Sequence, residues 1–265
     1  MRLVLYHFRV LKAIISVNFK VMSVYRASLL ASFMANIAFF VTNIVFTIIL
    51  FTNISDVGGW TMYEMLLRAG VGQAMFYGFF SIFAPGLWSI GSNVNSGNID
   101  FHLLLPVNTR FYISLHQLNI SQFFPLLAGI VLAVYSFIRA GIQSNIFSIL
   151  FFAVLVVISV ITLYNIFLIC VSLELKFVRF SFLQALFFTM TSSVGQPLEI
   201  FSGLFKTFIV FIVPIGVLAD YPVRWITRGL ELWQIIYFLS LPVVTYLLSR
   251  WVFSWGLRNY RGASS

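Results

Sequence analysis

The hydrophobic positions of this chain form long runs, and a few charged positions divide them into intervals. A helix needs about 20 apolar residues to cross a hydrocarbon core of about 30 Å. Four uncharged intervals exceed that length, namely 27–55, 69–99, 111–138 and 140–173. With a last apolar run before Arg250, they predict spans at Leu29–Phe51, Ala69–Ile90, Phe111–Phe137, Asn145–Leu173 and Trp233–Trp255.

The second of these spans carries signals of close packing. Its small residues, which let helices approach one another, are Gly70, Gly72, Gly78 and Gly86. Pro85 near its end predicts a kink. Trp60 and Tyr63, which precede it, fit an aromatic belt at the membrane interface.

The region from Ser181 to Leu218 predicts a fifth span that is broken. As one helix it would be about 57 Å long, too long even for a tilted crossing. Helix breakers and charges interrupt it, namely Gly195, Gln196, Pro197, Glu199, Lys206, Pro214 and Gly216. We therefore expect a bend or a re-entrant segment within residues 181–232, covered by protein or by a water-filled cavity. The crossing itself is either Ser181–Ile200 or Phe205–Leu218.

Residues 1–28 carry a basic amphipathic pattern. One face recurs at three- and four-residue steps, namely Arg9, Lys12, Ser16, Lys20, Ser23 and Ala27. Another face is apolar, namely Val10, Ile14, Val17, Val21 and Val24. The pattern predicts a helix lying in the cytoplasmic membrane interface, with its lysines reaching lipid phosphates. A frayed basic tail is the alternative.

Composition also places the chain in lipid. Hydrophobic residues make up 61%, charged residues 9%, and the mean hydropathy is +1.01, whereas soluble domains carry about 25% charged residues. No polar stretch is long enough for a separate soluble core. We expect an all-α integral membrane protein with one domain over residues 1–265, six transmembrane helices and an N-terminal interfacial helix.

The positive charges predict the orientation of the chain. The net charge of +9 is spread over loop ends, which indicates topology signalling rather than nucleic-acid binding. With the N-terminus inside, five of the sixteen Lys and Arg residues lie outside, namely Arg68, Arg139, Lys206, Arg224 and Arg228. The opposite orientation would violate the positive-inside rule, so both termini are expected in the cytoplasm.

The most informative polar segment is the loop at residues 91–110. It opens with turn formers, namely Gly91, Asn93, Asn95, Gly97 and Asn98. Asp100 then caps, and Pro106 ends, a short cytoplasmic helix. The apolar residues of this helix are Phe101, Leu103, Leu104 and Leu105. They must bury against the membrane surface or against a protein partner, and the residues alone favour neither.

The sequence lacks the motifs of several enzyme classes. It contains no HExxH, no GxSxG, no phosphate-binding glycine loop followed by lysine, and no pair of intramembrane carboxylates. Cys170 is the single cysteine, so one chain offers no disulfide and no thiolate metal site. His7, His102 and His116 are isolated and indicate interfacial or contact residues. We expect no catalytic residue, metal or cofactor in this chain.

One motif after the second span is specific: Gly97-x-Ile99-Asp100-x-x-Leu103-Leu104-Leu105-Pro106. Supporting motifs along the chain are Tyr25-Arg26, Gly59-Trp60 followed by Glu64, the prolines Pro197, Pro214 and Pro222, and Gly256-Leu257-Arg258-x-Tyr260. Together they make the chain similar to the permease subunits of bacterial type-2 ATP-binding-cassette transporters.

That resemblance implies a fold and partners. It implies six spans in the bacterial inner membrane, with cytoplasmic termini and re-entrant outer helices between spans five and six. It also implies a homo- or heterodimer that forms an export path, and two separate ATPase subunits that bind ATP and Mg. These would dock on the loop after the second span, through Gly97, Ile99, Asp100, Phe101, Leu103, Leu104, Leu105 and Pro106. Cargo is not specified.

Polar side chains of the second and fifth spans are candidates for lining the path, namely Gln73, Tyr77, Thr189, Thr191 and Gln196. The alternative function is an ATP-independent secondary transporter or channel. It predicts a charge deep in the membrane, and the first four predicted spans have none at their centres. An intramembrane enzyme is a further alternative, for which the sequence supplies no catalytic dyad.

Overall fold

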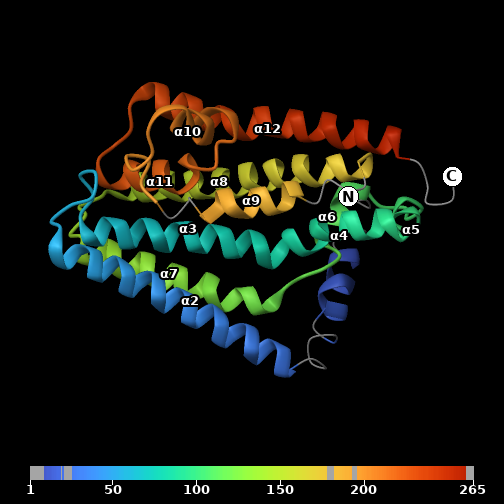
Figure 1. The fold of residues 1–265 in the computed structure, drawn as a ribbon, viewed down its shortest axis with the longest axis horizontal. Helices are drawn as coiled ribbons and strands as arrows, with labels where there is room; N and C mark the ends of the chain where they lie inside the picture. Colours follow the sequence, from blue (N-terminus) through green and yellow to red (C-terminus); the bar gives the residue numbers. More distant parts are fainter. Residues whose placement is uncertain (1–8, 19, 21–25, 178–181, 193–195, 261–265) are drawn as a thin grey trace.

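The computed structural model describes residues 9–18, 20, 26–177, 182–192 and 196–260, and the account below concerns these residues. They form a bundle of long helices, drawn with its long axis horizontal in Figure 1. Within this part of the chain there is no β-strand, only an isolated bridge between Val57 and Trp60. The all-α fold class predicted from the sequence is confirmed.

The described helices follow one another along the chain without an intervening strand. The α-helices are α2 (Arg26–Asn53), α3 (Met62–Ile82), α4 (Ala84–Asn95), α5 (Ile99–Leu103), α6 (Thr109–Leu115), α7 (Phe123–Arg139), α8 (Ile146–Ser172), α9 (Phe182–Ser192), α10 (Gly203–Thr207), α11 (Val217–Thr227) and α12 (Leu232–Asn259). Short 3-10 turns are η1 (Ile120–Gln122) and η2 (Leu173–Leu175), and η4 (Phe208–Ile212) is a π-helix.

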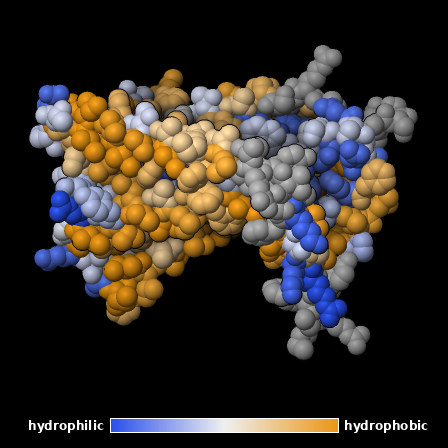
Figure 2. All heavy atoms as spheres, turned by 90° about the horizontal axis from the view of Figure 1, so that it is seen from below, coloured by the Kyte–Doolittle hydropathy of each residue, from blue (hydrophilic) through white to orange (hydrophobic). Residues whose placement is uncertain are grey.

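The bundle carries a broad apolar surface between two polar ends (Figure 2). Among the described helices, α2, α7, α8 and α12 are each long and apolar enough to cross a membrane. Two bent pairs also qualify if each pair is taken as one span: α3 with α4, and α10–η4 with α11. The chain is therefore a multi-pass membrane protein.

We name the two ends of the bundle by the elements found there. The α5 end contains residues 96–108, and the α11 end contains the loops at 54–61 and 228–231. Figure 1 places the two ends at opposite extremes of the long axis, with α12 and α8 running between them. The helical residues 9–18 and the last turn of α12 both lie at the α5 end, as an even number of crossings requires.

The second span is longer than the sequence pattern predicted. It begins at Met62 rather than Ala69, so Glu64 and Arg68 belong to α3 and not to the preceding loop. The predicted kink is present: α3 and α4 meet at a 47° bend around Phe83, and Pro85 occupies the first turn of α4. Proline is tolerated there because the first N–H groups of a helix need no intrahelical partner.

Close packing of this span on α7 rests on two glycines. A Cβ atom at Gly70 would lie 2.7 Å from the backbone nitrogen of Ala133, and one at Gly129 would lie 2.8 Å from that of Ala74. Neither distance leaves room for a side chain, so the two helices touch through their backbones. The expectation that glycine-rich span two packs inside the bundle is confirmed.

The third span was expected to be one ordinary helix over Phe111–Phe137, and this was wrong. The structure divides it into α6, η1 and α7. The free backbone groups at the break find partners elsewhere: Asn18 accepts from the Leu118 N–H at 3.0 Å and donates to the His116 carbonyl at 3.2 Å. The Asn119 N–H donates to the Ser81 carbonyl at 2.9 Å. A buried break is stable only when such groups are paired.

The fifth region is broken, as predicted. Gln184 of α9 bonds Glu174 at the α5 end, and Glu199 receives the Trp60 indole N–H at the α11 end, so the chain crosses between them. This favours Ser181–Ile200 as the fifth crossing, with 178–181 and 193–195 outside the described residues. The remaining helices, α10–η4 and α11, form a pair bent by 88°.

That bent pair is re-entrant at the α11 end. The hydroxyl of Ser159, near the middle of α8, donates to the Leu218 carbonyl at 2.7 Å, whereas the Trp225 indole donates to the Ser148 carbonyl at 3.1 Å near the start of α8. Helix α11 therefore runs from the middle of the bundle back to the α11 end. The chain then enters α12. The described residues contain four to six candidate spans, and six are reached here when the α9 region, rather than the re-entrant pair, is taken as the fifth.

The N-terminal amphipathic prediction is only partly within the described residues. Residues 9–18 are helical, whereas 1–8, 19 and 21–25 lie outside the description. Lys12 is exposed and Ile14 is buried, in agreement with the two predicted faces. Val17, assigned to the apolar face, is exposed. This segment packs beside the α6–η1 break through Asn18.

Candidate functional site

The predicted short helix of the loop at 91–110 is α5, a single turn. Gly97 has φ of 74°, a left-handed conformation that glycine adopts without strain, and it reverses the chain after α4. The Asp100 N–H then donates to the Gly97 carbonyl at 3.3 Å, and the Leu104 N–H closes the turn on the Asp100 carbonyl at 3.2 Å. The prediction that Asp100 caps this helix was wrong, because the helix already begins at Ile99. Asn98 occupies the N-cap position without a side-chain cap hydrogen bond, and Asp100 lies in the first turn, where its charge favours the helix N-terminus.

The apolar residues of α5 divide into an anchor and an exposed surface. Ile99 is 1% exposed and packs into the core, whereas Phe101 is 70% and Leu104 is 81% exposed. Leu105, at 37%, extends the exposed surface. We call Phe101, Leu104 and Leu105 the α5 tip. It lies at an end of the bundle that is otherwise largely polar, and no described residue of the chain covers it.

Aromatic rings fix α5 to α6. The His102 ring lies edge-on to Tyr112 and His116, with centroid distances of 5.3 and 5.1 Å, and Tyr112 stacks on His116. A Cβ atom at Gly86 would lie 2.2 Å from the Ile113 carbonyl oxygen, so α4 and α6 touch closely as well. A force on the α5 tip therefore reaches both the α3–α4 bend and the broken third span.

Burial controls the ionisation of His102. It lowers the pKa of this ring below its ordinary value of 6.5, so the ring is largely neutral at pH 7. Burial, and then the negative charge of Asp100, raises the pKa of the Tyr260 hydroxyl, which places α5 beside the end of α12.

A pocket of about 760 Å³ lies next to α5. The α3–α4 bend, the α6–α7 connection, η2 and α9 form its walls. Five aromatic side chains line it, namely Phe76, Tyr77, Phe80, Trp88 and Phe188. Its polar lining includes Gln117, Gln122 and Gln184 together with the carboxylate of Glu174.

The predicted path residues lie in different places. Tyr77 lines this pocket, whereas Gln73 faces α7 and donates to the Pro125 carbonyl at 3.4 Å. Thr189 and Thr191 both lie on α9, where Thr189 is exposed and Thr191 is buried. Gln196 is exposed beyond the end of α9. Sequence reasoning missed Glu174 and Gln184, because the pattern placed Glu174 in a loop and gave no signal of its burial.

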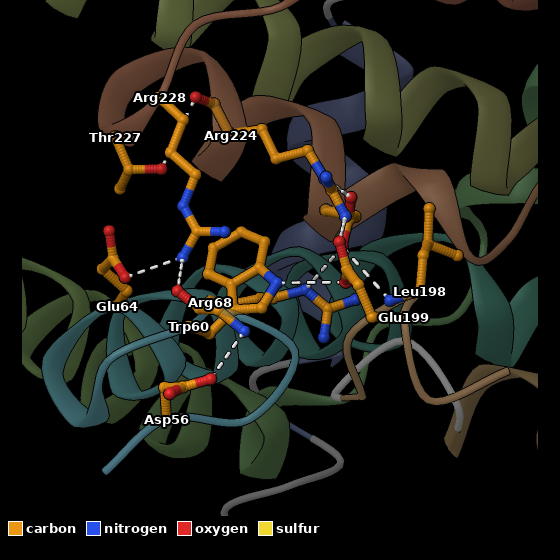
Figure 3. A network of polar contacts seen from close by, with 11 residues as sticks. Asp56, Trp60, Glu64, Arg68, Leu198, Glu199, Arg224, Thr227 and Arg228 are labelled. Carbon is orange, nitrogen blue, oxygen red and sulfur yellow. Dashed lines mark hydrogen bonds and ion pairs between the residues drawn. The ribbon is translucent and has the colours of Figure 1, made fainter.

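A second polar site lies at the α11 end (Figure 3). Trp60 is fully buried, with the guanidinium groups of Arg228, Arg224 and Arg68 at 4.3, 5.4 and 5.9 Å from its ring. Its indole N–H donates to Glu199 at 3.1 Å. The interpretation of Trp60 as part of an interfacial aromatic belt was wrong, because the arginines and the re-entrant chain cover it.

The carboxylates around Trp60 form ion pairs with the three arginines. Arg68 and Asp220 are both fully buried, and their Nε and Oδ1 atoms are 3.3 Å apart. Arg224 pairs with Asp220 and Glu199, and Arg228 with Glu64 at 2.9 Å. Burial raises the pKa of Glu199, but hydrogen bonds from Arg224 and Trp60 outweigh it and the net shift is downward. We call these residues and Trp60 the Trp60 network. It ties α3, the chain at 198–199 and α11 together.

The chemistry of the described residues does not include a metal centre. No three His, Cys, Asp or Glu side chains in this part of the chain come together in a way that could hold a metal ion. Cys170 is a free thiol within α8. The two polar sites therefore consist of aromatic rings, ion pairs and, in Glu174, a buried carboxylate for which the described residues offer no ion pair.

Comparison with known proteins identifies the chain. No curated protein and no solved structure matches it significantly. A family model described as ABC-2 family transporter protein matches residues 37–264, which include α5, the pocket and the Trp60 network. The match covers most of the chain and agrees with the resemblance found in its motifs. The chain therefore belongs to the ABC-2 transporter family and is a membrane permease of an ABC transporter.

Proposed function

We propose that this permease is the membrane subunit of an ATP-driven exporter, and that its α5 tip is the surface on which an ATPase subunit docks. Two permease subunits, identical or different, would form the path, and two separate ATPases would bind ATP and Mg. The observation that carries the proposal is the α5 tip itself. The one-turn helix and its C-cap present two large apolar side chains, Phe101 and Leu104, that no described residue covers, while Ile99 anchors the turn.

The structure around α5 supports a coupling role for the whole segment. An interaction surface must be rigid if it is to transmit motion, and α5 is fixed to α6 by a cluster of three aromatic rings, with His102 edge-on to the stacked Tyr112 and His116. The α4 helix above it leads directly to the 47° bend, where the pocket lies. A push on Leu104 would therefore move the wall of the pocket. The coupling residues remain Gly97, Ile99, Asp100, Phe101, Leu103, Leu104, Leu105 and Pro106.

This proposal assigns the α5 end to the cytoplasm, where ATP is available. The protein would lie in the bacterial cytoplasmic membrane with both termini inside. The positive-inside rule supports this orientation. The path would begin at the pocket beside α5 and continue along α3 and α9, where Tyr77, Thr189 and Thr191 lie.

An ATP-independent secondary transporter is favoured by one observation, the buried Arg68–Asp220 pair. Charges inside a span often mark an ion path. Arg68, however, lies six residues into α3, about 9 Å from its start. Its partner Asp220 is also bound by Arg224, so the charges neutralise one another within the Trp60 network. We therefore assign the pair a structural role and retain the ATP-driven function.

The test uses Leu104→Asp, which places a charge on the α5 tip. We expect the tagged variant to lose at least tenfold in copurification of its ATPase from mild detergent, and to lose ATP-driven transport in parallel, since each 1.4 kcal/mol of lost contact energy is about tenfold in affinity. Asp100→Lys should weaken both in the same direction. Leu204→Asp is the control, because Leu204 is 90% exposed on α10 at the opposite end.

Two outcomes would contradict the proposal. One is unchanged ATPase copurification with Leu104→Asp. The other is transport that continues at the wild-type rate after the ATPase has been removed, which would establish the secondary transporter instead. Equal loss in Leu104→Asp and Leu204→Asp would show general damage to the fold, and it would reject α5 as the specific docking surface.

A further inference from the structure

The pocket beside α5 is lined by a carboxylate and by no basic residue among the described residues, although the protein as a whole is basic. The chain has a net charge of +9, yet no Lys, Arg or His lines this pocket in the part of the chain that the structure describes. Its one ionisable carboxylate is Glu174. The pocket is therefore suited to a positive ligand and unsuited to an anion.

Glu174 is buried without an ionic partner. It is 2% exposed, and none of the ion pairs among the described residues includes it. Its hydrogen-bond partner in this part of the chain is the amide of Gln184, which donates to Oε1 at 2.7 Å. A carboxylate has about four acceptor positions, and burying one without a counter-charge is costly. A cation in the pocket would offset that cost.

The fold makes room for this carboxylate. A Cβ atom at Gly91 would lie 2.2 Å from Oε2 of Glu174, so only glycine at this position of α4 leaves space for the side chain. The pocket contains a second acceptor that a positive ligand could satisfy. Oε1 of Gln122, another lining residue, is buried and has no hydrogen-bond partner. Gln122 Oε1 has no donor and Glu174 has one, from Gln184, so both groups keep free acceptor positions.

Aromatic rings complete the recognition surface. Trp88 and Phe188 lie 4.7 Å apart between ring centroids, and Phe80 lies 4.8 Å from Phe188. The faces of aromatic rings attract cations and also cover apolar groups. The volume of about 760 Å³ is in the range of sites for small organic ligands.

We propose that this pocket binds an amphiphilic cation, with an ammonium or similar positive head at Glu174 and an apolar body between Trp88, Phe80 and Phe188. The inference rests on the proposed function, because it names the class of cargo that the path takes up at the α5 end. A ligand of this class partitions into the surface of a membrane, and the proposed orientation would place this pocket on the cytoplasmic side.

The experiment compares two ions of the same shape and opposite charge. The full-length permease in nanodiscs of zwitterionic lipid is titrated with radiolabelled tetraphenylphosphonium and with tetraphenylborate, and binding to empty nanodiscs is subtracted. We expect saturable binding of the phosphonium, and binding of the borate that is at least about tenfold weaker, because Glu174, the one charged residue among the described residues that line the pocket, attracts the first ion and repels the second. This comparison needs no variant.

Variants then locate the site. Glu174→Gln keeps the shape of the side chain and an oxygen for Gln184, and we expect it to weaken phosphonium binding by about tenfold. Phe188→Leu, which removes a ring at similar volume, should weaken it less. Glu231→Gln is the matched control, because Glu231 caps α12 at the opposite end of the bundle. It should leave binding unchanged.

The outcomes separate this inference from the proposed function, since binding is measured without nucleotide or ATPase. Equal binding of both ions, or unchanged binding in Glu174→Gln, would overturn the cation site even if Leu104→Asp abolishes ATPase docking. Conversely, intact phosphonium binding with no effect of Leu104→Asp would reject the coupling proposal and keep the site. Should Glu174→Gln fail to fold, Phe188→Leu and the two-ion comparison decide.

Discussion

Arg68 shows how one residue can stabilise the α11 end. Its guanidinium group is fully buried, and Asp220 is its ionic partner in the described chain. Asp220 has a second partner in Arg224 and lies 3.5 Å from the Leu198 N–H, so it links α3 to α11 and to the chain that leaves the fifth crossing. A buried charge that loses its partner is strongly destabilising.

Asp220 has two ionic partners, whereas Arg68 has one in the described chain, so removing Asp220 should destabilise the protein more than removing Arg68. Arg68→Met should lower the free energy of unfolding by about 3 kcal/mol, the low end for a broken buried pair, because Asp220 keeps Arg224. Asp220→Leu should cost more, about 5 kcal/mol, because Arg68 is left with no carboxylate. SDS titration monitored by tryptophan fluorescence measures both. Lys206→Met, at an exposed position, is the control, and an Asp220→Leu effect smaller than that of Arg68→Met would contradict the account.

At the scale of elements, α5 depends on the neutral state of His102. Burial lowers the pKa of this ring below the value of about 6.5 that it has in the unfolded chain. The unfolded chain therefore binds more protons than the folded one as the pH falls below 6.5. Stability from this ring is complete above that pH and is lost as the pH falls through the lowered pKa.

We therefore expect the thermal midpoint of the protein in nanodiscs to fall between pH 7.5 and pH 5.5. The rings of His102 and His116 have centroids 5.1 Å apart, so two protonated rings would also repel each other and loosen α5. His102→Phe keeps a ring against Tyr112 and removes one charge, so its midpoint should fall less. An identical fall in the variant and the wild type would assign the pH dependence to other groups.

At the scale of the whole molecule, the re-entrant pair and the fifth crossing decide which loops share a side. Ser96, before α5, and Ser55, before α3, are both exposed and lie at opposite ends of the bundle. In a Cys170→Ser background, a cysteine at either position has no competing thiol in the chain. An impermeant maleimide can then report the side of the membrane.

We expect Ser55→Cys to be labelled in intact spheroplasts, and Ser96→Cys only after the membrane is opened. Labelling of both from one side would contradict the crossing by α3–α4. The reverse pattern would keep the crossings and overturn the orientation, and with it the docking of an ATPase on α5. Blocking the thiols beforehand with a permeant maleimide provides the control for nonspecific labelling.

The sequence by itself determined the membrane class, the break in the fifth region and the presence of a short helix after the second span. These properties are local: an apolar run must be long enough to span, and glycine and proline act on their own neighbours. The anchoring role of Ile99 and the cap at Asn98 were not predicted, whereas the apolar residues Phe101 and Leu104 were.

Only the tertiary structure decided where charges and breaks inside the bundle are stable. The sequence pattern placed Arg68 in a loop, because a single charge ends an apolar run. Its ion-pair partner, Asp220, lies far away in the sequence. The break in the third span depends on Asn18 and Ser81, and the burial of Glu174 depends on Gly91. Each requires a partner from another helix, so no local pattern could indicate it.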